Sequence, residues 1–255
     1  MAHPTIAVLE RQLTSYRRLF WASAFSAFVL PVLFVLSIGV GVGGYVNANG
    51  GLDGMDYLSF IAPGVLASTA FQMAVGESTF PILGDFRWTR GFHAMRATPV
   101  GVRDMVGGGL LYIVFRVLVA CLAFLLVAGL FGALHSWWTV VTPLVCGLLG
   151  AAVAAPVTAF SATIDNDNYF ALLFRFGVIP STLFAGVFFP VDQLPLLVRP
   201  VAYASPLWHG VELCRSATLG VAPTWPVALH VAYLLAWLVV GYLLATRAFR
   251  RKLEN

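Results

Sequence analysis

The segment DFRWTRGFHAMRATPVGVRD, residues 85–104, is basic, rich in aromatic side chains and flanked by two long apolar runs. Each flanking run suits a membrane helix, because about 20 residues at 1.5 Å rise cross about 30 Å of hydrocarbon. A positively charged segment between two such runs is expected to face water. We therefore take it as the segment around which the rest of the chain is organised.

The composition excludes an ordinary soluble domain. Of the 255 residues, 60% are hydrophobic and only 10% are charged, whereas about a quarter of the residues in a soluble domain are charged. In hydrocarbon, only helices and closed barrels satisfy the backbone hydrogen bonds. The apolar runs are continuous and do not alternate with polar residues, which favours helices. We predict one all-α integral membrane domain over residues 1–255.

The apolar runs predict six transmembrane helices, at about residues 19–43, 57–81, 107–131, 137–160, 169–189 and 225–249. The first run is too long for a cleavable signal peptide, so we expect it to remain as a span. If both termini lie on the same side of the membrane, 11 of the 15 Lys and Arg residues lie on that side as well. Only Arg199 and Arg215 then fall on the opposite side. The positive-inside rule then places both termini in the cytoplasm, in the plasma membrane.

Residues 1–18 predict an amphipathic helix in the lipid headgroup region. Charged and polar residues alternate with apolar side chains that recur every three or four positions. The apolar positions are Ile6, Leu9, Leu13, Tyr16 and Phe20. This spacing is typical of interfacial helices. The alternative is a disordered basic leader.

Residues 190–224 predict a re-entrant or interfacial segment on the outer face. Ser205 is a suitable N-cap, Pro206 fits the first helical position and Gly220 is a suitable terminator. The helix over residues 206–219 would be about 21 Å long, too short to span. Residues 193–203 predict a shorter helix, broken at Pro200.

The sequence offers little for catalysis. A P-loop needs a lysine after its glycine-rich turn, and the one lysine, Lys252, lies in the C-terminal tail without such a turn. His209 and Glu212 share a helical face, but no third ligand or HExxH motif accompanies them, so we predict no metal site. We therefore expect no cofactor in this chain and no enzyme activity of its own. We also expect no nucleic-acid partner, because membrane topology accounts for the net charge of +4.

The three cysteines, Cys121, Cys146 and Cys214, have neither CxxC spacing nor an even count. We expect them to be small buried hydrophobic side chains.

Charged residues inside spans are costly and usually have a structural or functional reason. Glu77 and Arg116 fall at similar depths in two consecutive spans. We predict an interhelical ion pair between them, with a structural role or a contact to substrate. Arg175 falls near the inner end of its span and is expected to extend to the membrane surface.

The opening segment is expected to dock into a soluble protein. Its apolar side is formed by Phe86, Trp88, Phe92, His93 and Met95, and its basic side by Arg87, Arg90 and Arg96. Thr98 and Pro99 end one short helix and start another. An aromatic knob with flanking arginines suits a cleft on a partner. The alternative is a basic loop that only sets topology.

Four stretches resemble the ABC-2 type permeases, the membrane subunits of a class of ABC exporters, and especially their NodJ-like branch, associated with lipo-oligosaccharide export. They are APGVLASTAFQMAVGEST (62–79), FHAMRATPVGVRD (92–104), FFPVDQLP (188–195) and SPLWHGVELCRSATLG (205–220). The resemblance implies a six-span permease that pairs with a second copy of itself and with two copies of a separate ABC ATPase, which would hold the ATP and Mg.

The resemblance also implies site residues. The N-terminal helix and the cytoplasmic coupling segment, residues 85–106, would contact the ATPase, through Glu10, Arg11, Arg17, Arg87, Arg90, Phe92, His93, Met95, Arg96, Thr98, Pro99 and Arg103. Residues 193–219 would form an outer gate, with Trp208, His209, Glu212 and Arg215.

The expected function is export of an amphipathic molecule, such as a lipo-oligosaccharide, a glycolipid or a hydrophobic drug, powered by the separate ATPase. Spans rich in Phe, Leu and Val suit a substrate with a large apolar part. Two alternatives stay open. One is an ion-coupled secondary transporter, for which Glu77 is the candidate carboxylate. The other is a membrane-embedded enzyme that modifies glycolipids.

Overall fold

The computed structural model describes residues 3–18 and 56–254, together with residues 29, 32–33, 37 and 41–48. Every regular element in these residues is helical, as the continuous apolar runs predict. Within them, four helical stretches are long and apolar enough to cross a membrane: Tyr57–Arg87, Val102–Leu130, Trp137–Thr163 and Val227–Glu254. They correspond to the predicted spans that begin at residues 57, 107, 137 and 225. Most of the predicted first span and most of the loop after it lie outside the described residues.

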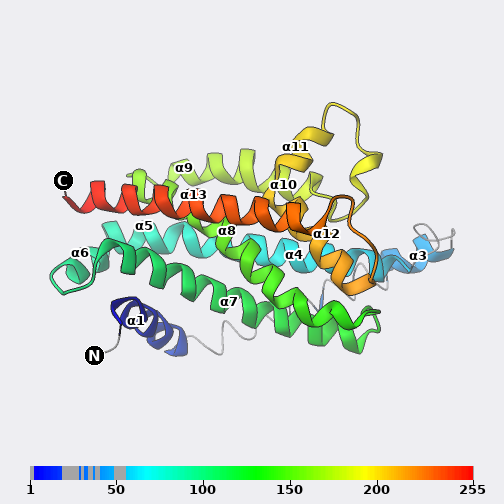
Figure 1. Cartoon of the computed structure of the whole chain (residues 1–255), viewed down its shortest axis with the longest axis horizontal. Helices are drawn as coiled ribbons and strands as arrows, with labels where there is room; N and C mark the ends of the chain where they lie inside the picture. Colours follow the sequence, from blue (N-terminus) through cyan, green and yellow to red (C-terminus); the bar gives the residue numbers. More distant parts are fainter. Residues whose placement is uncertain are drawn as a thin grey trace.

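The long helices run side by side along the length of the molecule (Figure 1). They are α4 (Tyr57–Ser78) continued by α5 (Phe80–Arg87), α7 (Val102–Leu130), α8 (Thr142–Thr163, preceded by η2, Trp137–Val141) and α13 (Val227–Glu254). Both termini lie at the same end of the bundle as α5 and the short helix α6 (Gly91–Arg96), whereas α3 (Gly43–Ala48) lies at the opposite end. Polar segments far apart in the sequence are thus gathered at one end.

The centre of the bundle is α8, which packs against α4, α7 and α13. Small buried side chains allow the close approach: α8 contains Gly150, Ala152, Ala154 and Ala155, all buried. On the facing helix, a Cβ added at Gly241 would lie 2.5 Å from Cδ of Pro156. Helices in membranes commonly associate through such small residues, so this crossing of α8 and α13 depends on glycine.

The predicted fifth span is helical from residue 168 to residue 184, in three pieces: α9 (Asn168–Leu172), η3 (Leu173–Val178) and α10 (Ile179–Phe184). The middle piece is a π-helix. The helical part is shorter than the predicted 169–189, because Gly186 takes a positive φ of 74° just after it and the chain leaves the helix there. A hydropathy pattern reveals neither the π-helix nor this early end.

The predicted N-terminal helix is confirmed as α1 (Pro4–Arg18), but its buried stripe agrees only in part with the predicted one. Val8 and Tyr16 are its buried apolar residues, whereas Ile6 is 45% exposed. The helix packs against α7. A Cβ at Gly108 of α7 would lie 2.7 Å from Cβ of Val8, so α1 rests directly on this glycine.

The predicted helix of the outer segment is confirmed as α12 (Pro206–Leu219), starting at its proline and ending at Gly220, whose φ is 73°. The capping role predicted for Ser205 is wrong, because its Oγ is buried without a hydrogen-bond partner. Most of α12 is buried, against α4, α8 and α13, so it does not lie free on a surface. Before it come η4 (Val191–Gln193) and α11 (Arg199–Ala204), where Pro200 sits in the first turn and does not break the helix.

Candidate coupling surface

The segment of residues 85–104 folds into a compact cap between α4 and α7. After a kink at Thr79, α5 extends to Arg87. Three residues separate it from α6, which begins at Gly91. Between them Arg90 adopts a left-handed backbone with φ 51°, uncommon for a residue with a side chain. Residues 97–99 form a turn before α7, so the predicted helix break at Thr98 and Pro99 is present.

Phe92 and Met95 do not form an outward-facing knob. Phe92 is 2% exposed and packs against Phe86 and Phe249, with ring centroids 4.7 Å and 4.9 Å away. Met95 is buried as well. The apolar side chains of this basic segment thus pin α6 to α5 and to the last turns of α13. The aromatic side chain that does face outward is Trp88, which is 68% exposed.

The basic side chains of the segment are exposed around Trp88. Arg90, His93, Arg96 and Arg103 all point to the surface, and so do Thr98 and Pro99. Arg87 is partly engaged, because its guanidinium donates hydrogen bonds to the backbone carbonyl of Asp165 at 3.1 Å and 2.5 Å. The result is a positively charged surface with one exposed indole, which we call the coupling surface: residues 87–103 together with α1.

α1 is attached to both ends of this segment. Arg11 donates two hydrogen bonds, at 3.1 Å and 3.2 Å, to the carboxylate of Asp85. At the other end, Thr5 donates to Asp104 at 2.7 Å. Asp104 also accepts a hydrogen bond from the backbone N–H of Gly101 at 3.1 Å, at the start of α7.

These contacts make α1 and the segment one structural unit, which still exposes Glu10 and Arg17 of α1. The sequence interpretation missed Asp85, Asp104 and Thr5. The available signal was that Asp85 and Asp104 are the only acids in a segment otherwise full of arginine.

The turn between α8 and α9 is held at the same end. Lys252 of α13 lies 3.2 Å from the carboxylate of Asp165 and donates to the carbonyl of Ile164 at 2.5 Å. Arg87 approaches the same turn from α5. The Asp165 side chain is 73% exposed, so this ion pair adds little stability. Its structural effect is to connect the coupling surface with the C-terminal helix.

The predicted ion pair between Glu77 and Arg116 is confirmed. The carboxylate on α4 and the guanidinium on α7 are 3.1 Å apart, and both side chains are mostly buried. Arg116 also donates to the hydroxyl of Tyr112 at 3.3 Å and lies 4.8 Å from the ring centroid of Tyr16. The pair therefore ties α4, α7 and α1 together. Arg175 lies in the π-helix with its side chain exposed.

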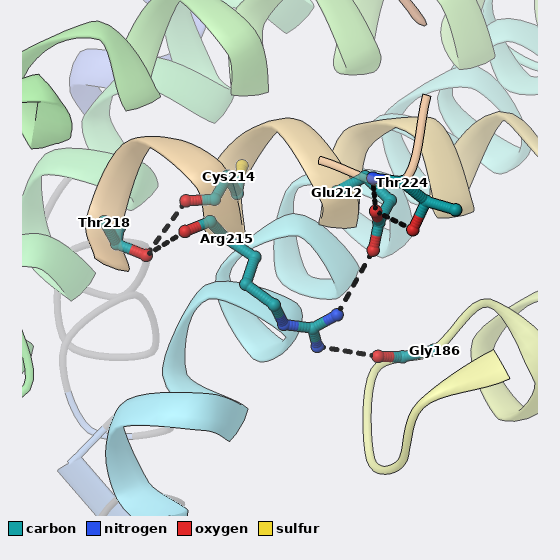
Figure 2. Close-up of polar contacts among 6 residues, drawn as sticks. All are labelled: Gly186, Glu212, Cys214, Arg215, Thr218 and Thr224. Atoms are coloured by element: carbon teal, nitrogen blue, oxygen red, sulfur yellow. Dashed lines mark hydrogen bonds and ion pairs between the residues drawn. The ribbon is translucent and has the colours of Figure 1, made fainter. Parts of the chain in front are cut away.

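At the opposite end, Arg215 of α12 links three parts of the chain (Figure 2). It donates to the carbonyl of Gly186 at 2.8 Å, lies 3.5 Å from Glu212, and stacks over the ring of Phe60 on α4 at 4.2 Å. Glu212 in turn accepts hydrogen bonds from the backbone N–H and the hydroxyl of Thr224, at 2.9 Å and 2.7 Å. The predicted gate residues thus fasten α12 to the loops on either side of it.

His209 and Trp208 belong to an aromatic cluster, and both side chains are fully buried. Its Nε2–H donates to the carbonyl of Tyr203 at 3.1 Å, so its Nδ1 accepts a hydrogen bond from Nδ1–H of His230 at 2.9 Å. Burial, and then the neighbouring His230 ring, lower the pKa of His209 to about 4. Glu212 binds Thr224, so the structure does not bring it and His209 together as metal ligands.

The three cysteines are free and buried, as predicted. Cys146 and Cys214 lie with their sulfur atoms 3.8 Å apart, between α8 and α12.

Comparison with known proteins supports the sequence resemblance. Residues 4–219 match the family model described as ABC-2 type transporter. The chain belongs to the ABC-2 type transporter family. It is 30% identical over 252 residues to a nodulation protein J of Rhizobium leguminosarum bv. viciae, covering 97% of this chain and 94% of the relative.

Two further relatives agree with this assignment. A nodulation protein J of Sinorhizobium fredii (strain NBRC 101917 / NGR234) is 30% identical over 249 residues, covering 97% of this chain and 93% of the relative. The inner membrane transport permease YadH of Escherichia coli (strain K12) is 24% identical over 208 residues, covering 79% of this chain and 78% of the relative. This ABC-2 permease is thus a membrane transport subunit, and its family implies an ABC ATPase as partner.

Proposed function

We propose that this ABC-2 permease exports an amphipathic molecule across the plasma membrane, powered by ATP hydrolysis on a separate ABC ATPase that docks on the coupling surface. Two ATPase copies and a second permease copy complete the complex, with ATP and Mg held by the ATPase. Both termini lie in the cytoplasm. The observation that carries the proposal is the coupling surface itself, a basic surface with an exposed indole, gathered at the end where both termini lie.

The contacts at this surface suggest how force reaches the membrane helices. Arg11 and Thr5 attach α1 to the two ends of the segment, and Phe92 packs against α13 through Phe249. Movement of a docked ATPase would displace α1, α5 and α6 as a unit and tilt α4, α7 and α13 with them. The equilibrium between the inward-facing and outward-facing permease would be shifted because the ATPase binds the two states with different affinities.

The proposed substrate class is supported by the resemblance to NodJ-like permeases and by the composition. Two of the similar chains are nodulation protein J, and the spans here are rich in Phe, Leu and Val. We propose a discrete amphiphile such as a lipo-oligosaccharide, with a glycolipid or hydrophobic drug as the next candidates. An apolar wall would stabilise its chains by dispersion.

A secondary transporter is less well supported, because Glu77, the candidate carboxylate for ion coupling, is already paired with Arg116. The Arg116 guanidinium, 3.1 Å away, balances the negative charge that would otherwise attract a transported cation.

The experiment is co-purification with the cognate ABC ATPase, followed by ATPase measurement with and without the extract that contains the substrate. The proposal predicts a stable complex whose hydrolysis rises when substrate is present. Transport by the permease alone, driven by an ion gradient, would contradict it.

A further inference from the structure

A small, mostly enclosed cavity lies beneath α1, between α7, α8 and the aromatic rings of Phe92 and Phe249. Gln12 of α1, Met105 and Gly109 of α7, and Thr158 of α8 are among its lining residues. The space in which the centre of a water molecule can lie is about 10 Å³. That is about the lower limit for holding one water, which is about 10–15 Å³ by the same measure.

Two polar atoms of this lining are buried without a hydrogen-bond partner among the residues that the structure describes. They are Oε1 of Gln12 and Oγ1 of Thr158. Thr158 is only 3% exposed, and its hydroxyl does not turn back onto its own helix as Thr14, Thr69 and Thr182 do in theirs. A buried polar atom without a partner is costly, so an unpaired acceptor and an unpaired hydroxyl in one enclosed space call for a ligand.

We propose that this cavity binds one water molecule that bridges α1 to α8. The water donates a hydrogen bond to Oε1 of Gln12 and accepts one from the hydroxyl of Thr158. A purely apolar cavity stays dry, whereas a cavity of sufficient size with two or more polar groups holds water. Water fits better than a larger ligand, because the space admits one molecule and none of the described lining residues is charged.

The bridge gives α1 an attachment to α8 in addition to its contacts with α7 and Asp85. A bridging water tolerates small shifts of its two partners better than a direct hydrogen bond does. The buried amide oxygen of Gln12 therefore keeps a partner when α1 moves relative to α8. The inference rests on the cavity and its two polar atoms, and is independent of which protein docks on the coupling surface.

X-ray radiolytic labelling of the purified full chain tests the proposal directly. Radiolysis of a bound water generates a hydroxyl radical in place, and the neighbouring thioether of Met105, which is 2% exposed, is oxidised to the sulfoxide. We expect Met105 to be labelled despite its burial, and the labelling to fall severalfold in Thr158→Val and persist in Thr158→Ser. Thr142→Val is the matched control, since Thr142 is also a buried, unpaired hydroxyl of α8 but does not line this cavity.

The direction of the stability change distinguishes a wet cavity from a dry one. With water bound, Thr158→Val strands the Gln12 amide and lowers the melting temperature, and adding Gln12→Met restores most of the loss. In a dry cavity, Thr158→Val removes an unpaired hydroxyl and raises the melting temperature. A rise in melting temperature, or equal labelling of Met105 in the wild type and Thr158→Val, would overturn the proposal.

Discussion

Glu77 and Arg116 are charges in helices apolar enough to cross a membrane, and each has the other as its partner at 3.1 Å. Removing one partner of a mostly buried ion pair lowers the free energy of unfolding by more than the intact pair contributes to it. The reason is that the remaining charge stays desolvated without a partner. Arg116→Met should therefore lower the free energy of unfolding by about 2 kcal/mol. Thermal unfolding in detergent checks this, and the double variant Glu77→Met with Arg116→Met should regain most of the loss. Additive losses would show that the two side chains do not interact.

Arg90 combines an exposed charge with a left-handed backbone, φ 51°. A residue with a side chain pays about 1 kcal/mol for that conformation, which glycine adopts freely. Arg90→Gly should therefore leave the melting temperature unchanged or raised, while reducing ATPase binding by removal of the charge. Arg90→Lys is the matched variant, retaining both the charge and the strain. Equal ATPase affinity in all three proteins would mean that Arg90 does not contribute to docking.

His209 predicts a pH dependence at the other end of the molecule. Its pKa is lowered to about 4 in the folded chain, by burial first and by the neighbouring His230 second. An unfolded histidine titrates near about 6.5, so the unfolded state binds protons first as the pH falls. The contribution is fully present above about pH 6.5 and is lost as the pH falls toward 4.

The melting temperature should therefore drop between pH 7 and pH 5. In His209→Gln this pH dependence should be weaker, because the titrating group is removed. The measurement is a series of thermal melts in detergent, and a parallel pH profile in the two proteins would contradict the assignment.

At the scale of single elements, α1 depends on a glycine contact. A Cβ at Gly108 would lie 2.7 Å from Cβ of Val8 and 2.8 Å from the carbonyl of Thr5, whereas one at Gly107 would meet the Thr5 methyl at an ordinary 3.5 Å. Gly108→Ala should push α1 away from α7, and Gly107→Ala should not. Limited proteolysis of the N-terminus checks this, with faster cleavage expected only in Gly108→Ala. Similar cleavage in both variants would show that the helix is not seated on Gly108.

The elements also show what the sequence could and could not predict. The bounds of α12 were predictable to the residue, because Pro206 and Gly220 act locally on the backbone. The burial of Phe92 was not, since it depends on Phe249, which the chain brings alongside only in the folded bundle. The same holds for Asp85, whose partner Arg11 lies on another helix. The π-helix of residues 173–178 has no apolar signature of its own.

The whole molecule is a helical bundle in which polar contacts fasten both ends. At one end the coupling surface, which includes α1, is tied to α13 through Phe249 and to the turn at Asp165 through Arg87. At the other, Arg215 and Glu212 tie α12 to Gly186 and Thr224 (Figure 2). Transport requires that movement at the first end reach the second. The long helices α4 and α13 are suited to carry it, because both contact α12 and both extend to the coupling surface.

This arrangement predicts an uncoupled phenotype at the end opposite the coupling surface. Arg215→Gln loses the contact with Glu212 and the stacking on Phe60, so the loop at Gly186 should be held less firmly. Export should fall while ATPase binding at the distant coupling surface stays at the wild-type level. The matched control is Arg199→Gln, an arginine of the segment before α12 whose guanidinium donates to the nearby backbone carbonyls of Leu194 and Asp192. Loss of ATPase binding in Arg215→Gln would indicate general unfolding and contradict the assigned role.

Docking of the ABC ATPase on the coupling surface is tested by reconstituting the permease with its cognate ABC ATPase in proteoliposomes. The measurement compares substrate-stimulated ATP hydrolysis and export between the wild type and Trp88→Ala combined with Arg96→Glu, two exposed side chains of the coupling surface. The account predicts that this variant inserts and melts like the wild type but loses both stimulation and export. Wild-type stimulation and export in the variant would contradict the claim that the ATPase drives transport through this surface.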